Sequence, residues 1–334
     1  MVECNGSLHT QFNSMPKYIF LTVLLFQNFY IAAQSNWVRT DSLYTPLPSS
    51  MEVWKSIAPV GGRPSIVYLV RAKLSDPELL FTADTSFKRR LTPSQFFEKN
   101  NKPLLVANTS FFSFVTHQNL NVVIKNRKQL SYQVHSIPGK GRDTLTWRHP
   151  LGSAIGIKKN RTADAAWIFT DSISKYPLAV QAPVMPYKDS QPTLSKKIFL
   201  SILQSKNKPK PWKMETAVGG GPMLVQNGKV AIANEEELKF AGRAIEDRHP
   251  RTAMGYSADG WLLILVAEGR HPGKAEGLTL RQTAQLLIDW NCWEGLNLDG
   301  GGSSALLING KQTITPSDKE GERAVPGVFL IKRN

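Results

Sequence analysis

Apolar residues in this chain occur mainly as short unbroken or alternating runs, a pattern typical of β-strands. Such runs predict strands at 65–72, 78–82, 104–107, 121–124, 153–157, 165–170, 261–267 and 305–308. Two helices, from residues 94 and 280, are each predicted by a capping box, Thr92 with Gln95 and Thr279 with Gln282. We therefore expect an α+β fold with a large twisted mixed β-sheet core and few flanking helices.

Polar residues follow several of these predicted strands. Asn108 follows the strand at 104–107, Asp299 ends a brief strand that begins at Leu296, and Glu268 follows the strand at 261–267. Sheets of the α/β type tend to place ligands at the ends of their strands. We therefore predict an active cleft at the strand ends, with Asn108 and Asp299 presented by neighbouring strands.

Three consecutive glycines occur twice in the chain. They are Gly219, Gly220 and Gly221, and then Gly300, Gly301 and Gly302, the second triplet being followed by Ser303 and Ser304. Glycine permits positive φ, and successive backbone N–H groups can converge on an anion. The first triplet is not a P-loop, because no Gly-Lys-Ser/Thr follows it at the required spacing. Simple turns are the alternative for both triplets.

Two arginines lie beside predicted strand ends. Arg251 stands where a strand begins, and Arg270 comes two residues after Glu268. Guanidinium groups bind phosphate or carboxylate in a bidentate manner, which is the functional interpretation of this placement. A surface ion pair, which contributes little to stability, is the alternative.

The N-terminal region differs from the rest of the chain. Residues 1–14 are polar and patternless, whereas Met15-Pro16-Lys17 lead into the apolar run 18–26 and the small residue Ala33. This pattern describes a secretory signal peptide, and the run is shorter than the ~20 residues that a membrane span needs. We expect residues 1–33 to be a signal peptide, with Met15 a candidate initiator. The protein is then exported, periplasmic or secreted, and has no stable membrane span.

Residues 34–334 are expected to form a single domain, in which the Pro-, Ser- and Lys-rich segment 177–213 is an irregular insertion. Cys292 is the only cysteine in this part of the chain, so no intramolecular disulfide is expected. The formal charge of +15 favours anionic partners. Such partners are phosphate-bearing glycans, anionic membrane surfaces or nucleic acid, and a merely solvated basic surface is the alternative. Because the chain has no nucleic-acid motif and is expected to be exported, we expect a phosphate-bearing glycan rather than nucleic acid.

Five blocks of the chain, in order, resemble the phosphodiester glycosidase family. They are Asn108–Phe112, Val218–Lys229, His249–Gly255, Gly277–Leu280 and Asn297–Ser304, and the resemblance runs from about Pro103 to Leu330. Two positions depart from it. The family's Asn-Gly pair is Asn108-Thr109 here, and its Asp-Gly-Arg is Glu268-Gly269-Arg270. The resemblance implies that a sugar is cleaved from a sugar-1-phosphodiester, which leaves a phosphomonoester.

This chemistry gives the candidate residues hypothetical roles. A phosphomonoester is a better leaving group than an alkoxide, so stabilising it matters more than protonating it. We predict Asp299 as general base or nucleophile and Glu268 as a second carboxylate. The remaining candidates are expected to bind substrate. Arg251 and Arg270 would hold the phosphate, and Asn108 and Ser303 would bind oxygens of the phosphate or of the sugar. Backbone N–H groups would be donated by Gly219, Gly220, Gly221, Gly300, Gly301 and Gly302.

Two other functions use the same residues differently. A non-catalytic module could bind anionic exopolysaccharide or cell-wall glycan through the arginines without needing Asp299. A phosphodiesterase would instead cut the P–O bond on the side away from the sugar and leave the phosphate on the sugar. The histidines show no metal-ligand spacing, so the cofactor is unknown, although Asp299, Glu268 and Asn108 could supply oxygen ligands to a divalent cation.

Overall fold

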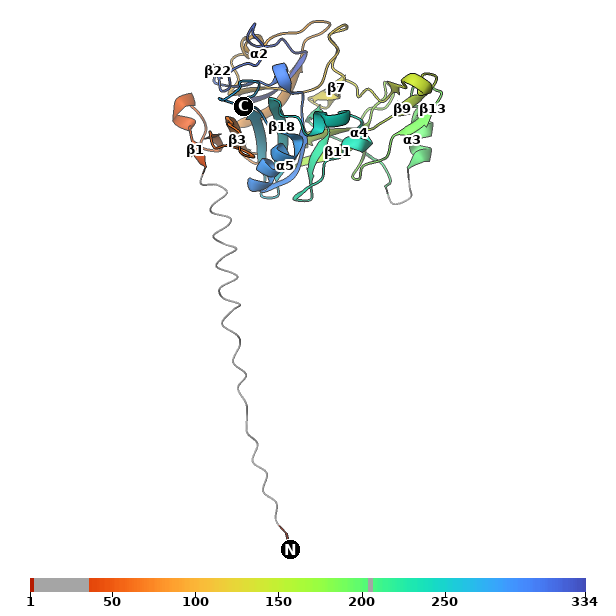
Figure 1. Cartoon of the computed structure of the whole chain (residues 1–334), viewed down its shortest axis with the longest axis horizontal. Helices are drawn as coiled ribbons and strands as arrows, with labels where there is room; N and C mark the ends of the chain where they lie inside the picture. The colour runs from red at the N-terminus through yellow and green to blue at the C-terminus, as the bar shows by residue number, and fades with distance from the viewer. Residues whose placement is uncertain (3–35, 204–206) are drawn as a thin grey trace. The chain divides into compact units, whose positions relative to one another are not determined.

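The computed structural model describes residues 1–2, 36–203 and 207–334. Residues Trp37–Asn334 form one compact unit (Figure 1). The predicted signal peptide, 1–33, lies almost wholly outside the described residues, so it stays a prediction. Among the described residues, none of the helices combines the length and the apolar character that crossing a bilayer requires.

The largest sheet has eight strands. In spatial order these are β1 (Trp37–Arg39), β2 (Met51–Ser56), β3 (Val67–Lys73), β19 (Trp261–Ala267), β18 (Arg251–Ser257), β20 (Cys292–Asn297), β16 (Met223–Gln226) and β17 (Lys229–Val230). The unbroken apolar run of β19 is buried because the strand lies in the interior of this sheet, between β3 and β18.

Three smaller sheets complete the β structure. The seven-stranded sheet has the order β14 (Lys210–Pro211), β12 (Leu178–Val180), β11 (Ala163–Phe169), β10 (Gly152–Ile157), β15 (Thr216–Gly219), β6 (Val123–Lys125) and β7 (Lys128–Ser131). The five-stranded sheet has the order β22 (Lys311–Gln312), β21 (Leu306–Ile308), β5 (Leu105–Asn108), β23 (Gly327–Arg333) and β4 (Leu79–Thr85). The third has the order β13 (Tyr187–Asp189), β9 (Trp147–His149) and β8 (Ile137–Pro138).

Within residues 36–203 and 207–334 the helices are few and short. They are α2 (Pro93–Lys99), α3 (Lys196–Ile202), α4 (Asn234–Glu237) and α5 (Leu280–Asp289), with 3-10 turns η1 (Asp41–Tyr44), η2 (Gly141–Asp143), η3 (Gly242–Ile245) and η4 (Gly301–Ser303). Both predicted capping boxes are present, at the starts of α2 and α5. Helix α5 packs Leu280, Ala284 and Leu287, all fully buried, against the eight-stranded sheet. Burying a leucine side chain in this way contributes about 2 kcal/mol.

The α+β class, with a large β core and few helices, is confirmed. One feature of the prediction needs correction, because every described ladder is antiparallel and the core is divided among several sheets instead of forming one mixed sheet. A single apolar cluster joins the eight-, seven- and five-stranded sheets, with members such as Val70, Trp167 and Phe329.

The two glycine triplets carry the chain from one sheet to another. Gly219 ends β15 of the seven-stranded sheet, and Met223 opens β16 of the eight-stranded sheet. Likewise β20 ends at Asn297, and Leu306 opens β21 of the five-stranded sheet. Asn108 and Asp299 therefore belong to different sheets, contrary to the expectation of neighbouring strands, and their strand ends meet where the sheets adjoin.

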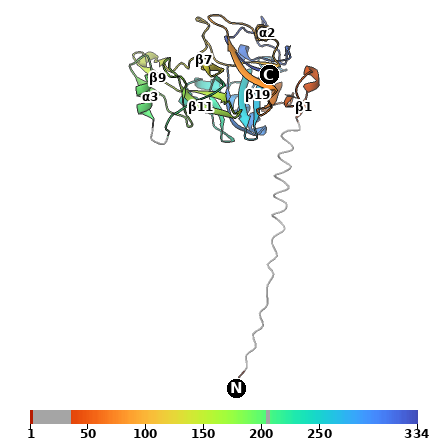
Figure 2. The same cartoon turned by 180° about the vertical axis from the view of Figure 1, so that it is seen from behind.

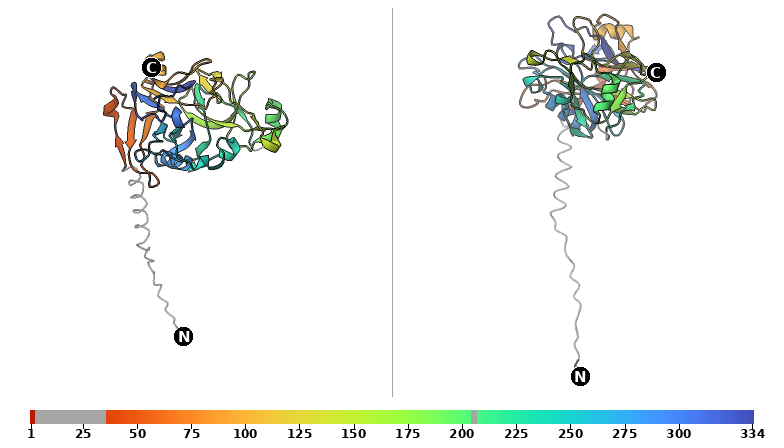
Figure 3. Two further views of the ribbon diagram at one scale, coloured as in Figure 1. Left: turned by 45° about the horizontal axis from the view of Figure 1, so that its top comes forward. Right: turned by 90° about the vertical axis from the view of Figure 1, so that its right-hand side faces the viewer.

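Segment 177–213 forms short elements, with β12, β13, α3 and β14 separated by irregular chain. Figure 1 places α3, β9 and β13 together at one end of the compact unit, opposite β1, and Figure 2 shows α3 and β9 at this same end. Figure 3 (right) looks onto this end. Residues 204–206 within the segment lie outside the described residues.

Candidate active site

Asp299 is held at the junction of the eight- and five-stranded sheets. Its backbone N–H donates to the carbonyl of Thr109 at 2.7 Å, and its own carbonyl accepts from the Asn108 amide at 2.6 Å. One oxygen of its carboxylate accepts the N–H of Gly300 at 3.0 Å. The position of this carboxylate is therefore fixed by residues from both sheets.

The Asn108 side chain is fully buried and serves this junction. Its oxygen accepts hydrogen bonds from the Thr252 hydroxyl at 2.7 Å and from the backbone N–H of Ala305 at 3.0 Å, while its nitrogen reaches Asp299. We expected this amide to bind substrate. In the structure both ends of the amide have protein partners, and its nitrogen holds the backbone of Asp299.

Burial raises the pKa of Asp299 to about 6. The Ser303 side chain, the Gly300 N–H and the charge of Arg323 act in the opposite direction but do not cancel the cost of desolvation. A carboxylate that titrates near neutral pH is a stronger base than a solvated one and is still ionised at pH 7. Asp299 thus has the properties that a general base requires.

The second glycine triplet allows two arginines to lie against the backbone beside Asp299. A Cβ on Gly301, where φ is +61°, would come within 2.9 Å of the Arg270 guanidinium. A Cβ on Gly302 would overlap Arg323 and Asp318, each at 2.2 Å. Of the triplet's N–H groups, that of Gly301 is bonded to the carbonyl of Pro250 at 2.9 Å and that of Gly300 faces Asp299. These two amides are therefore not free donors, and the triplet acts mainly by giving room to the guanidinium groups.

Arg323 is a site residue that the sequence analysis missed. Its guanidinium forms a two-point pair with Asp318, with distances of 2.7 and 3.0 Å, and its charge lowers the pKa of Asp299. It lies in the loop between β22 and β23, where the sequence contains only a mixture of charged and turn residues. No local pattern distinguishes it from a solvated surface arginine.

Arg251 is buried at the first position of β18. Its Nε donates to the carbonyl of Leu278 and its Nη2 to that of Asp247, both at 2.9 Å. Burial lowers the pKa of Arg251 to about 10, and the nearby charge of Arg270 acts in the same direction. The Arg251 Cα lies 3.8 Å from the position that a Cβ on Gly300 would take. The backbone of Arg251 thus lies beside the second glycine triplet, while its guanidinium is held by the carbonyls of Leu278 and Asp247.

His249 lies close to these two arginines. Burial lowers its pKa, and the charges of Arg251 and Arg270 lower it further, so the imidazole stays neutral at pH 7. Its buried Nδ1 has no hydrogen-bond partner among the described residues. A neutral ring next to two cations can accept a proton or donate a hydrogen bond to an anion.

Glu268 is buried and both of its oxygens are engaged. Oε1 lies 3.0 Å from Nδ1 of His271 and 3.5 Å from Nζ of Lys274, and Oε2 accepts the N–H of Thr315 at 2.8 Å. The structure thus gives Glu268 a positioning role toward His271 and the loop that contains Thr315. Its role as a second carboxylate in catalysis stays a prediction.

The first glycine triplet is structural, which corrects the expectation that its N–H groups bind substrate. These three N–H groups donate to the carbonyls of Val122, Ser153 and Asn297 at 2.8, 3.1 and 2.7 Å. A Cβ on Gly220 would lie 2.5 Å from the Asn297 carbonyl, and one on Gly221 would overlap the Glu237 carboxylate at 2.1 Å. Glycine is required here so that β15 and β16 can approach β20 and the buried Glu237.

One wall of the site combines aromatic rings with a lysine. Phe111 and Phe240 pack edge to face at 6.1 Å, Nζ of Lys239 lies 5.4 Å from the Phe111 ring, and the Arg251 guanidinium lies 5.6 Å from Phe240. Burial lowers the pKa of Lys239, while the carboxylate of Glu237 raises it. No sequence pattern singles out Lys239, because Glu235–Lys239 has the pattern of a solvated charged run.

Buried hydroxyl groups without partners lie on the two chain segments that meet at Asp299 and Asn108. Among the described residues, those of Thr109, Ser110 and Ser304 are buried and lack a hydrogen-bond partner. A buried polar group left unpaired costs about 1–3 kcal/mol. Three of them at one strand junction, next to several guanidinium groups, indicate a site built to bind a polar ligand.

A profile of the phosphodiester glycosidase family matches residues 101–332, which is most of the chain. The chain belongs to the phosphodiester glycosidase family. The match includes Asn108, Arg251, Arg270 and Asp299, and it extends to Arg323. The resemblance inferred from the five sequence blocks is thereby confirmed.

Curated relatives match this chain over shorter segments. The bovine (Bos taurus) N-acetylglucosamine-1-phosphodiester alpha-N-acetylglucosaminidase is 31% identical over 109 residues, which cover 30% of this chain and 20% of the relative. The SPbeta prophage-derived uncharacterized protein YomE of Bacillus subtilis (strain 168) is 38% identical over 84 residues, covering 25% and 13%. The matched segments thus span a fifth or less of the length of these two relatives.

Solved structures share the fold of this chain. The zebrafish N-acetylglucosamine-1-phosphodiester alpha-N-acetylglucosaminidase catalytic domain, auto-inhibited by its pro-peptide, superposes with a TM-score of 0.58 at 20% identity. The superposition covers 87% of this chain and 85% of that one. A hypothetical protein from Synechocystis superposes with a TM-score of 0.57 at 13% identity. This superposition covers 85% of this chain and 62% of the Synechocystis chain.

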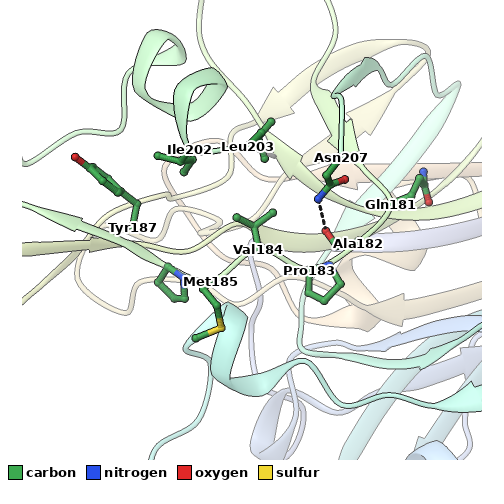
Figure 4. Close-up of a pocket in the computed structure, with 10 residues that line it drawn as sticks. Gln181, Ala182, Pro183, Val184, Met185, Tyr187, Ile202, Leu203 and Asn207 are labelled. Carbon is green, nitrogen blue, oxygen red and sulfur yellow. Dashed lines mark hydrogen bonds between the residues drawn. The ribbon is translucent and has the colours of Figure 1, made fainter. Parts of the chain in front are cut away.

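The cavity shown in Figure 4 is separate from the candidate site. It has a volume of about 630 Å³ and lies in the 177–213 segment, with apolar side chains such as Val184, Ile202 and Leu203 in its lining. Asn207 donates to the carbonyl of Ala182 at 3.2 Å across it (Figure 4). Its described lining contains no carboxylate and no cation, so it lacks the chemistry that glycosyl transfer needs.

No group of three or more His, Cys, Asp or Glu side chains able to hold a metal ion occurs among the described residues. Two of the three side chains named for a divalent cation, Asn108 and Glu268, are engaged otherwise. Asn108 bonds to the protein at both ends, and Glu268 is occupied by His271, Lys274 and Thr315. The described side chains therefore do not form a ready ligand set for a divalent cation.

Proposed function

We propose that this protein hydrolyses a glycosyl phosphodiester, releasing the sugar and leaving a phosphomonoester on the other product. The observation that carries this proposal is the Asp299 carboxylate, whose pKa is raised to about 6, on a backbone against which the Arg270 and Arg323 guanidinium groups lie. A base for water and cations for phosphate are the two requirements of this reaction.

In the proposed reaction Asp299 accepts a proton from water as the water oxygen attacks the anomeric carbon. The bond between that carbon and the bridging oxygen breaks, and its electron pair stays on the phosphate oxygen. Arg251 and Arg270 stabilise the additional negative charge of the departing phosphomonoester. The Asn108 side chain positions Asp299 by donating a hydrogen bond to the backbone carbonyl of Asp299.

The substrate class follows from the same cations. A phosphodiester retains one negative charge, which suits the guanidinium groups of Arg251 and Arg270. The relatives named for N-acetylglucosamine-1-phosphodiester support a sugar 1-phosphodiester as substrate. We further propose that the protein acts after export, as the signal-peptide pattern of residues 1–33 predicts.

The test is a panel of sugar-1-phosphodiesters with identification of both products by mass spectrometry. Free sugar together with a phosphomonoester of the aglycone is the expected result. A sugar phosphate would indicate a phosphodiesterase that cuts the other P–O bond. Binding without any product, unchanged in Asp299→Asn, would indicate a glycan-binding module instead.

A further inference from the structure

Large apolar side chains gather on one exposed surface of the protein. Phe87 is 82% exposed, Phe114 57%, Val115 88%, Tyr132 45% and Val134 45%. Single exposed apolar residues are common on protein surfaces, but several within adjoining loops require an explanation. We call these five residues, together with Lys88 and Arg89, the aromatic–basic face.

The loops that carry this face lie side by side. A cavity of about 340 Å³ is lined jointly by residues of 85–88, 117–119 and 130–134, Phe87, Tyr132 and Val134 among them. Phe114 and Val115 lie in the tight loop that joins the bonded backbones of Ser113 and Gln118, directly before the second of these segments. The face is therefore one surface built from segments distant in sequence.

These loops are ordered in a way that holds the apolar residues outward. Lys88 has φ of +52°, in the left-handed region, and the Ser86 hydroxyl donates to the carbonyl of Arg89 at 2.7 Å. His117, on the neighbouring loop, also has positive φ, at +57°. Left-handed backbone in residues other than glycine costs about 1–3 kcal/mol, so it persists where the surrounding structure requires it.

Cations surround the exposed rings. Nζ of Lys88 lies 5.2 Å from the Phe87 ring, the Arg90 guanidinium 5.1 Å from Phe114, and the Arg323 guanidinium 5.5 Å from the same ring. Lys88 and Arg89 are exposed. Two acids of the surrounding segments are already paired, Asp84 with Lys99 and Lys125, and Asp318 with Arg323. The face therefore combines exposed apolar side chains with uncompensated positive charge.

We propose that the aromatic–basic face docks the protein onto an anionic lipid bilayer. Aromatic and aliphatic side chains at the tips of ordered loops enter the headgroup region, and Lys88 and Arg89 bind the negative surface. Charge complementarity favours an anionic bilayer as the partner of this face. Cations lie beside its aromatic rings, and the chain carries a formal charge of +15. A face that mixes apolar tips with cations fits a bilayer interface better than a soluble polyanion, which would not need Phe87 or Val115.

Docking has a consequence for the substrate, and this consequence rests on the proposed function. Arg323 contacts the Phe114 ring and also packs on Gly302 beside Asp299. The face is thus continuous with the candidate active site. A protein bound through it would present Asp299 to phosphodiesters whose aglycone is a membrane lipid.

The experiment is co-sedimentation of residues 37–334, the compact unit, with vesicles of phosphatidylcholine alone or with 30% phosphatidylglycerol (about one anionic lipid in three). We expect strong binding to the anionic vesicles and weak binding to the neutral ones. Phe87→Ser/Val115→Ser and Lys88→Glu/Arg89→Glu should each lower the partition coefficient by about tenfold or more, since each basic residue near such a surface contributes about 1 kcal/mol.

Matched controls carry the same changes outside the face. Leu43→Ser/Ile57→Ser alters residues that are 57% and 69% exposed, and Lys208→Glu/Lys210→Glu reverses two exposed lysines. Both should bind within about twofold of the unmodified protein. Equal loss in these controls, unchanged binding in the face variants, or binding to acidic polysaccharide in place of vesicles would overturn the proposal.

Asp299→Asn separates docking from catalysis. This variant should bind vesicles like the parent protein, because Asp299 is not part of the face. Failure of the proposed hydrolysis would leave vesicle binding intact, whereas failure of docking would leave turnover of soluble phosphodiesters intact. The two proposals can therefore fail independently.

Discussion

The Asn108 amide donates a 2.6 Å hydrogen bond to the backbone carbonyl of Asp299 and so joins the ends of β5 and β20 across two sheets. Asn108 also accepts hydrogen bonds from Thr252 and Ala305. One buried amide thereby connects three segments at the point where the candidate base is located. Several consequences for activity and stability can be measured.

Asn108→Ala should lower both stability and activity. The change leaves buried donors of Thr252 and Ala305 unpaired, so we expect the free energy of unfolding to fall by about 2–4 kcal/mol. Turnover per folded molecule should fall at least about tenfold, because Asp299 loses a positioning contact. Urea denaturation and kcat measurements on the folded fraction test this prediction.

Asn100→Ala is the matched control for that variant. Asn100 is also buried and bonds to Asp84 and to the carbonyl of Phe96, away from the site. Its loss should reduce stability to a similar degree without changing kcat of the folded protein. Equal loss of kcat in both variants would contradict a specific role for Asn108.

Activity should depend on pH through Asp299. A general base must be ionised, so kcat/KM should fall about tenfold for each pH unit below 6 and level off above it. Because burial is the cause of the raised pKa, added salt should shift the acidic limb of the pH profile less than it would if a surface carboxylate were the titrating group. A flat profile between pH 4.5 and 6 would exclude Asp299 as the group that titrates (a range chosen around its pKa of about 6).

Asp299→Asn should abolish hydrolysis while raising stability at pH 7.5. Because the folded-state pKa of Asp299 lies above its unfolded value, stability falls as pH rises from about 4 to about 6, and the full penalty remains above that range. Removing the charge should recover about 1–2 kcal/mol at pH 7.5 and nothing at pH 3. Denaturation at the two pH values, with and without the substitution, measures this difference.

Arg270 is also expected to lower the stability of the protein while supporting its activity. Its φ of +64° is unfavourable for a residue with a Cβ. Arg270→Gly should therefore raise the free energy of unfolding by about 1 kcal/mol while lowering kcat/KM by about a hundredfold. Arg270→Ala keeps the backbone strain, so it should lose the same activity without the gain in stability. A phosphodiester hydrolysed equally well by all three proteins would show that Arg270 does not contact the phosphate.

Sequence patterns predicted the local elements of this fold well. Capping boxes located α2 and α5, and the apolar run of β19 marked an interior strand, because these signals depend on neighbouring residues only. The division into several antiparallel sheets was not predicted, since strand pairing joins residues such as Val328 and Asn108 that are far apart in the chain. Strand ends were recognised as the site, whereas the change of sheet at each glycine triplet was not.

The candidate site was predicted in part for the same reason. Asp299, Arg251 and Arg270 stand next to recognisable strand ends and do share one region. Arg323 and Lys239 were missed because their importance depends on what they pack against, Gly302 in one case and Phe111 in the other. Gly219, Gly220 and Gly221 were misinterpreted because a sequence cannot show whether an N–H group already has a partner.

Gly220→Ala tests this corrected role of the first triplet. A Cβ there would lie 2.5 Å from the carbonyl of Asn297 and 2.8 Å from the Leu298 side chain, and the N–H already bonds to Ser153. We expect a loss of stability of about 2–4 kcal/mol from overpacking, with KM of the folded protein unchanged. A donor to phosphate would behave differently, because shifting its N–H would raise KM for the phosphodiester even where the fold persists. Measuring KM below the unfolding transition, at a temperature where Gly220→Ala is fully folded, decides between packing and substrate binding.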